Sequence, residues 1–273
     1  MTPGTGDSRR PRLSLPFTIL AEPDTVRLVA GEDFRYTLTG KGLDRWLPAL
    51  LSALDGRRSL AEALAAIEEP QRAAAAVVLE RLYGERVLVE GSAADAHASL
   101  SARLQPEGRG ALLEDLATGD PASAPLAILC QDRLDYDEAL SFNRRCLDGG
   151  APWMWATFGP LERGYVSPVF LPSSGPCLAC LLGQFRRRSP APEIYDALLE
   201  QGRSGKAIQP VLFPREGVGI LRNLIRWKAA LLAESVPPAA LYRLQVLDAR
   251  TLEVSAHRVF LDPECGECRG RRR

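Results

Sequence analysis

The sequence has no charge imbalance and no long apolar run. Lys plus Arg and Asp plus Glu number 34 each, so the net charge is zero. Proteins that bind nucleic acid or anionic membranes usually carry an excess of basic residues, so we expect neither partner. No apolar run approaches the roughly 20 residues needed to span a bilayer, and no apolar core of a signal peptide follows the first charged residues. We therefore expect a cytoplasmic protein.

A glycine-rich phosphate loop is also lacking. The G-x-G-x-x-G type of nucleotide-binding turn needs closely spaced glycines between a strand and a helix. The nearest candidates, Gly108 with Gly110 and Gly217 with Gly219, lack the flanking strand, the third glycine, or both. The sequence thus predicts no ATP site and no catalytic residue.

What remains is the composition of an ordinary folded protein. Hydrophobic residues make up 46% of the chain and charged residues 25%, which argues against wholesale disorder. Residues 1–13 are rich in Pro, Gly and Arg and are predicted to be disordered, and residues 92–124 are predicted to be a linker. Two candidate domains result, residues 14–91 and residues 125–273.

Three short strands followed by three helices are predicted in residues 14–91. Ser59 and Glu62 form a capping box at the start of the second helix. Pro48 lies inside the apolar pattern of the first helix, where proline costs about 3 kcal/mol unless the helix starts later. The predicted strands cover residues 15–20, 25–30 and 33–39, the helices begin near residues 43, 59 and 70, and Gly84 ends the third.

This element order, closed by a short strand at residues 86–90, is typical of a winged helix-turn-helix. DNA reading is its common use, but acidic residues outnumber basic ones by three between residues 14 and 91. The other use is peptide capture, in which a strand edge accepts a peptide and a helix groove takes its side chains. The predicted peptide-binding residues are Phe34, Arg35, Tyr36, Thr37 and Leu38 on the third strand and Ala75, Val78, Leu79 and Leu82 on the third helix.

The first domain also resembles a known family. The Phe-Arg-Tyr-Thr-Leu strand at residues 34–38 and the Ser-Leu-Ala-Glu helix start at residues 59–62 are similar to the PqqD-like recognition element of peptide natural-product biosynthesis. The resemblance covers about residues 14–91. It implies that this domain binds the leader segment of a ribosomally made precursor peptide.

Short apolar runs alternate with helices in residues 125–273, which predicts an α/β fold. The run at residues 125–130 is short and continuous, as in a strand buried on both faces. The predicted strands cover residues 125–130, 153–157, 165–171, 241–247 and 253–259, and the predicted helices cover residues 136–147 and 218–232.

Two Cys-x-x-Cys pairs, Cys177 with Cys180 and Cys265 with Cys268, carry the strongest chemical signal. In a reducing compartment, paired cysteines indicate a metal before a disulfide. Four thiolates match the tetrahedral demand of structural zinc, which leaves no open position for catalysis. A folded segment must bring the pairs together, because 84 residues separate them. Redox dithiols and an iron–sulfur cluster are the alternatives.

The other cysteines and the histidines are given no function. Cys130 and Cys146 lie in apolar contexts where a buried, inert thiol is expected. His97 falls in the predicted linker and His257 in a predicted strand.

The second domain resembles the C-terminal half of the ThiF/MoeB-type activating fold over about residues 125–268. The matching motifs lie at residues 143–153, 176–180, 247–251 and 262–268. That family uses the same two cysteine knuckles for zinc. The missing glycine-rich loop is a departure from that family, so the resemblance implies a truncated ThiF-like half without a nucleotide site.

A PqqD-like element fused to such a half resembles the leader-binding subunit of azoline-forming synthetases. The resemblance implies a non-catalytic subunit that delivers a precursor peptide to a YcaO-type cyclodehydratase. It also implies structural zinc, a homodimer and a flavin dehydrogenase in the same complex. The alternatives are a divergent ThiF-like adenylating enzyme and a zinc-stabilised DNA-binding regulator.

Overall fold

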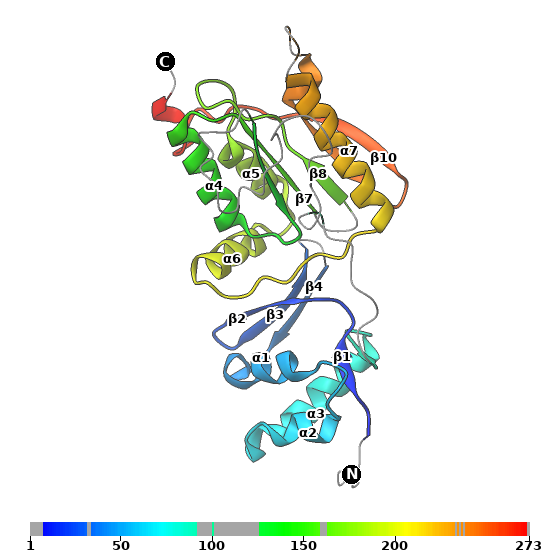
Figure 1. Cartoon of the computed structure of the whole chain (residues 1–273). Helices are drawn as coiled ribbons and strands as arrows, with labels where there is room; N and C mark the ends of the chain where they lie inside the picture. Colours follow the sequence, from blue (N-terminus) through cyan, green and yellow to red (C-terminus); the bar gives the residue numbers. More distant parts are fainter. Residues whose placement is uncertain are drawn as a thin grey trace. The chain divides into compact units, whose positions relative to one another are not determined.

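The chain forms a mixed α/β structure of two compact units, Met1–Ala96 and His97–Arg273 (Figure 1). Their boundary falls inside the predicted linker, of which Leu100 alone is described. Among the described residues, no helix is long and apolar enough to cross a bilayer. The computed structural model describes residues 8–31, 34–91, 100, 126–158, 163–232, 234, 236 and 238–271.

The first unit is built on a three-stranded antiparallel sheet in the order β2-β3-β4. These strands are β2 (Thr18–Glu22), β3 (Thr25–Ala30) and β4 (Phe34–Thr39), close to the three predicted ones. Val26 faces Leu38 across the β3–β4 pair, and both side chains are buried in the core of the unit. Because β3 is the one strand paired with β4 among the described residues, β4 forms an edge of this sheet.

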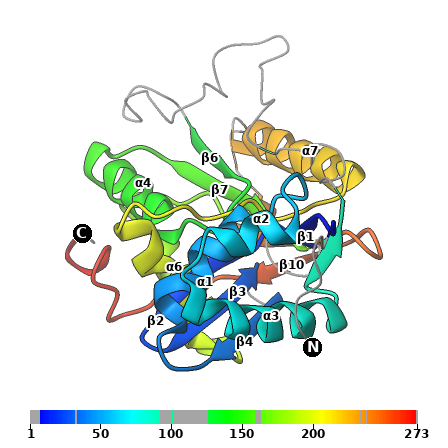
Figure 2. The same ribbon diagram turned by 90° about the horizontal axis from the view of Figure 1, so that it is seen from below.

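Three helices follow, and α1 packs against β2 and β3 (Figure 2). The capping box is confirmed, since Ser59 accepts from the Glu62 N–H and Glu62 accepts from the Ser59 N–H. The third helix ends at Gly84, as predicted, and the left-handed residue beyond it is Arg86, with a φ of 58°. The helices are α1 (Leu43–Ala53), α2 (Leu60–Ala65) and α3 (Glu69–Gly84).

Pro48 lies inside α1, so the energetic cost of an interior proline is not avoided by a later start of the helix. The helix begins at Leu43 and runs through the proline. Its buried face includes Trp46, Leu47 and Leu50. Burial of several large side chains, each contributing about 1.5–3 kcal/mol, outweighs the cost of one interior proline.

The predicted disorder of residues 1–13 is wrong for the residues just before the first domain. Pro11–Leu13 forms β1, which pairs antiparallel with β5 (Leu88–Glu90). Two further backbone bonds hold this segment, from Gly56 to the Pro11 carbonyl at 2.9 Å and from Leu60 to the Arg9 carbonyl at 2.8 Å. Backbone hydrogen bonds to distant parts of the chain order these residues. Their own sequence pattern does not predict a strand.

The second unit holds a five-stranded sheet in the order β10-β9-β8-β7-β6. The β6–β7 pair is parallel and the other pairs are antiparallel, so the sheet is mixed. β10 forms a hairpin with β9, as predicted. The strands are β6 (Ala127–Gln131), β7 (Trp153–Phe158), β8 (Arg163–Val166), β9 (Arg243–Asp248) and β10 (Glu253–Arg258).

Helices cover the inner strand β7 of this sheet on both faces, which explains its continuous apolar sequence. Trp153 contacts Phe142 of α4, with ring centroids 5.1 Å apart, whereas Met154 lies in one core cluster with Leu221 of α7. The sequence analysis places no helix where α5 and α6 lie. The helices are α4 (Tyr136–Gly149), α5 (Leu178–Arg188), α6 (Pro192–Arg203) and α7 (Arg215–Leu232), with short 3-10 helices η3 (Ala239–Tyr242) and η4 (Arg269–Arg271).

Two glycines of α7 should respond in opposite ways to substitution by alanine. A Cβ on Gly217 would lie 2.5 Å from Cε1 of Phe213, whose ring stacks on Phe158 and cannot easily move. A Cβ on Gly219 would meet nothing within 4 Å. We expect Gly217→Ala to lower the free energy of unfolding by about 1–3 kcal/mol and Gly219→Ala to raise it by up to about 1 kcal/mol. Urea unfolding measures both, and equal shifts would contradict this packing.

Candidate functional site

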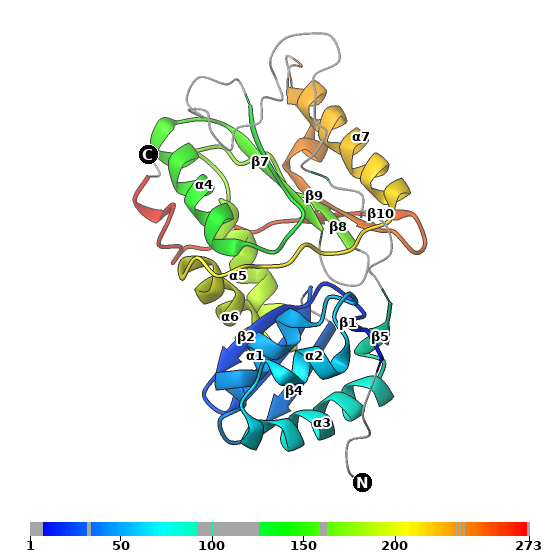
Figure 3. The ribbon, with the colours of Figure 1, turned by 60° about the horizontal axis from the view of Figure 1, so that its bottom comes forward.

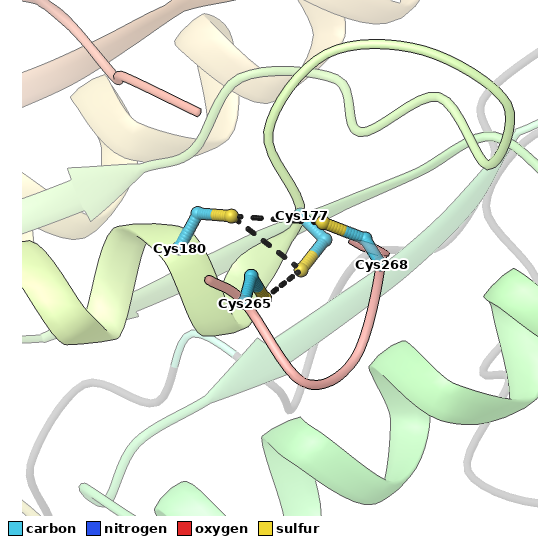
Figure 4. Close-up of side chains that lie close together, drawn as sticks. All are labelled: Cys177, Cys180, Cys265 and Cys268. Atoms are coloured by element: carbon cyan, nitrogen blue, oxygen red, sulfur yellow. Dashed lines mark hydrogen bonds between the residues drawn. The ribbon is translucent and has the colours of Figure 1, made fainter. Parts of the chain in front are cut away.

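The four cysteines of the two predicted pairs converge at one point of the second unit (Figure 4). Cys177 immediately precedes α5, and Cys180 lies in its first turn. Cys265 and Cys268 lie after β10, just before η4. The four sulfur atoms lie within 4.8 Å of one another, and all four side chains are buried.

The spacing of the sulfur atoms fits one metal ion. The Sγ–Sγ distances are 3.9 Å for Cys177–Cys180, 3.7 Å for Cys177–Cys265 and 3.7 Å for Cys180–Cys268. Zn–S bonds of about 2.3 Å in tetrahedral geometry place the sulfurs about 3.8 Å apart. A disulfide needs about 2.05 Å, and the cysteines are free. The arrangement therefore favours a metal over paired disulfides.

Without a cation the four thiols cannot all ionise. Cys177 keeps its proton because it hydrogen-bonds the Cys180 sulfur, which raises the pKa of Cys177 and lowers the pKa of Cys180. Burial raises the pKa of Cys265 as well. A divalent ion stabilises the charge of all four thiolates at once, and metal binding then releases protons. The donor set of four sulfurs fits zinc in a closed, structural site.

Polar side chains of α4 and α5 hold the two cysteine segments in place. The buried Asn143 accepts from the backbone N–H of Leu178 at 3.2 Å. Gln184 donates to the carbonyl of Phe260 at 2.8 Å, and Arg144 pairs with Glu267 at 3.1 Å. The sequence analysis assigns none of these a supporting role. Asn143 belongs to a motif that it does single out, whereas the partners of Gln184 and Arg144 lie too far along the chain for any local signal.

The predicted peptide-binding residues divide into an accessible set and a buried set. Arg35 and Thr37 are exposed on β4, and Tyr36 is half-buried. Phe34 begins β4, and its side chain lies outside the described residues. Core positions cannot line an open groove, so only part of the predicted set can face a ligand. The core members are Leu38, Ala75, Leu79 and Leu82, with Val78 half-buried beside them.

The outer row of α3 is exposed and lies outside the predicted set. Ala73, Val77 and Arg81 follow one another at intervals of four residues, so they share one face of the helix. Val77 is 71% exposed, which is unusual for a large apolar side chain on a helix. The guanidinium of Arg81 lies 5.9 Å from the ring centroid of Tyr36, so this row adjoins β4 (Figure 3). The four-residue spacing was available in the sequence and is the signal that could have found it.

No protein-family model and no curated protein matches this chain. Its structure is similar, at low identity, to solved heterocyclase and microcin synthetase structures. A heterocyclase in complex with substrate and cofactor is 19% identical, with a TM-score of 0.40 over 94% of this chain and 39% of that one. The heterocyclase TruD is 19% identical, with a TM-score of 0.41 over 95% of this chain and 43% of that one. The Escherichia coli microcin synthetase McbBCD complex is 13% identical, with a TM-score of 0.45 over 94% of this chain and 99% of that one.

This chain spans about two fifths of the length of the two heterocyclase chains. Each of these proteins is similar to this chain in structure. Its own residues supply two features that bear on function. One is the four-cysteine cluster, and the other is the open strand edge of β4 beside the outer row of α3.

Proposed function

We propose that this chain is the leader-peptide recognition subunit of an azoline-forming cyclodehydratase. Its first unit, a PqqD-like winged helix-turn-helix, binds the leader of a ribosomally made precursor peptide. Its second unit, a truncated ThiF-like half, holds one structural zinc ion. A YcaO-type partner supplies ATP chemistry, a flavin dehydrogenase belongs to the same complex, and this chain has no catalysis of its own.

The edge strand β4 is the observation that carries this proposal. An edge strand presents unpaired N–H and C=O groups, to which an extended peptide can add as a further strand. Main-chain bonds of this kind give affinity with little sequence preference. Exposed Arg35 and Thr37 on β4 border the added strand.

Specificity comes from the outer row of α3. An added strand beside β4 lies next to Tyr36 and Arg81, and Val77 lies one turn nearer the start of α3. An apolar leader side chain that covers Val77 removes both surfaces from water, which favours binding by about 25 cal/mol per Å². The small Ala73 and Ala74 leave room for that side chain, and both are exposed.

The zinc site serves the second unit as a cross-link. Cys177, Cys180, Cys265 and Cys268 would hold the ion, which supplies charge neutralisation and a fixed tetrahedral geometry. The site joins the start of α5 to the segment after β10 and so orders the C-terminal part of the unit. With four protein ligands, it leaves no position for a substrate.

Val77→Asp tests the recognition surface directly. We expect it to weaken binding of a labelled leader peptide by roughly 10- to 100-fold, because the leader would have to bury a carboxylate. Val77 is exposed, so the folded state should tolerate the change, unlike a charge at the core residues Leu79 or Leu82. Fluorescence anisotropy with a labelled candidate leader peptide gives the affinity.

Val236→Asp is the matched control, because it makes the same substitution at a valine of the second unit that is 80% exposed. Its affinity for the leader should equal that of the unchanged chain. Unchanged affinity in Val77→Asp, with circular dichroism and zinc content intact, would remove α3 from the binding site.

A further inference from the structure

The last strand of the second unit is exposed along its whole length. All six residues of β10 are exposed, although the strand belongs to a five-stranded sheet. β10 pairs with β9 on one side, and no described strand lies on the other. Its unpaired backbone groups are therefore open to another strand.

Natural proteins usually protect such an edge, and among the described residues β10 has only part of that protection, the charged side chains Glu253 and Arg258 at its ends. Lysine, proline, a bulge or a covering element discourages edge-to-edge pairing. The strand Glu-Val-Ser-Ala-His-Arg has no lysine and no proline, and its register with β9 runs without interruption. Apolar side chains are exposed around it: Leu252 at 55%, Val254 at 45%, Phe260 at 53% and Leu261 at 41%.

We propose that β10 pairs antiparallel with β10 of a second copy of this chain, so that the two five-stranded sheets become one continuous sheet. This inference is independent of the leader-binding proposal, because it concerns the second unit alone.

The geometry of antiparallel pairing limits the register to two choices near the middle of the strand. Residues that face each other both point their backbone groups toward the partner, or both point them away. A two-fold axis must therefore pass between two copies of one residue. In the centre of β10 that residue is Ser255 or Ala256.

Chemistry favours the axis at Ser255. Val254 then faces Ala256 of the partner subunit, and Glu253 faces the partner's His257, so apolar meets apolar and acid meets imidazole, twice each. An axis at Ala256 would instead set Val254 against Arg258 of the partner subunit. At the chosen register Ser255, whose hydroxyl lies 2.8 Å from Nε2 of His257 in its own strand, meets the partner's Ser255.

Cysteine cross-linking of the full chain tests the register. Ser255→Cys should give a disulfide-linked dimer on mild oxidation, because facing Cα atoms lie within the roughly 4.4–6.8 Å that a disulfide spans. His257→Cys is the matched control, since its two copies would lie four positions apart and should stay unlinked. The unchanged chain measures any background from the native thiols.

Light scattering after gel filtration tests the interface itself. The unchanged chain should be a dimer, and Ser255→Lys should raise the dimer dissociation constant about tenfold or more, because two like charges would face each other. The position is fully exposed, so zinc content and circular dichroism should not change. A monomeric unchanged chain, a dimer indifferent to Ser255→Lys, or equal cross-linking of Ser255→Cys and His257→Cys would each overturn the proposal.

Discussion

Cys180→Ala is expected to empty the zinc site and to unfold much of the second unit. Structural zinc contributes roughly 10–16 kcal/mol in small zinc domains, and the loss of one of four thiolates removes a large part of that. Cys180 is fully buried and lies 3.7 Å from the Cys268 sulfur, so its replacement removes one ligand from the interior of the cluster. Zinc should fall from one per chain to almost none, and the melting temperature should fall on the order of 10 °C or more.

Cys146→Ala is the control for this prediction. Cys146 is equally buried, on α4, but lies outside the four-sulfur cluster. Burial raises its pKa to about 12, so it stays a protonated thiol. Its replacement should cost about 1 kcal/mol of stability and leave the zinc content at one per chain. Full zinc occupancy in Cys180→Ala, or equal zinc loss in both variants, would contradict the assignment of the ligands.

Lys228 of α7 should give the second large effect, on the pH dependence of stability. The side chain is completely buried, and its ammonium group donates to the carbonyl of Ser167 at 2.6 Å and to the carbonyl of Arg243. It thereby links the end of β8 to the start of β9. Burial lowers the pKa of Lys228 from 10.5 to about 7.

The direction of the effect follows from the two protonation states. Between about pH 7 and 10.5, the unfolded chain binds a proton at Lys228 that the folded chain releases, so a rising pH favours the folded state. Below this window both states are protonated, and folding carries the full cost of a buried charge. Lys228→Met removes this titration but also loses two hydrogen bonds to carbonyl groups.

The free energy of unfolding of the unchanged chain should therefore rise relative to that of Lys228→Met between pH 7 and 10. The relative change should be on the order of a few kcal/mol. Denaturant unfolding at several pH values measures it, and the comparison cancels every other titrating group. Parallel curves for the two proteins would show that Lys228 keeps its ordinary pKa.

Local patterns in the sequence predict the local structure well. The capping box at Ser59 and Glu62 forms as expected because its partners lie three residues apart. The four cysteines are identified by spacing and compartment alone, and the structure brings them together.

Features that depend on distant partners are the ones the sequence does not predict. β1 is a strand because Pro11 pairs with Glu90, far along the chain. Pro48 is tolerated in α1 because tertiary burial outweighs a local cost. The core positions of Leu79 and Leu82 on α3, which the prediction assigns to a peptide groove, depend on how the helix packs against the rest of its unit.

Native mass spectrometry of the full chain, with the leader peptide and with ATP, tests the central claim most directly. A recognition subunit should appear with one zinc ion and one leader peptide bound, and with ATP unchanged. Zinc without leader binding would contradict the recognition role. Formation of AMP or an adenylate by this chain alone would replace it with an activating enzyme.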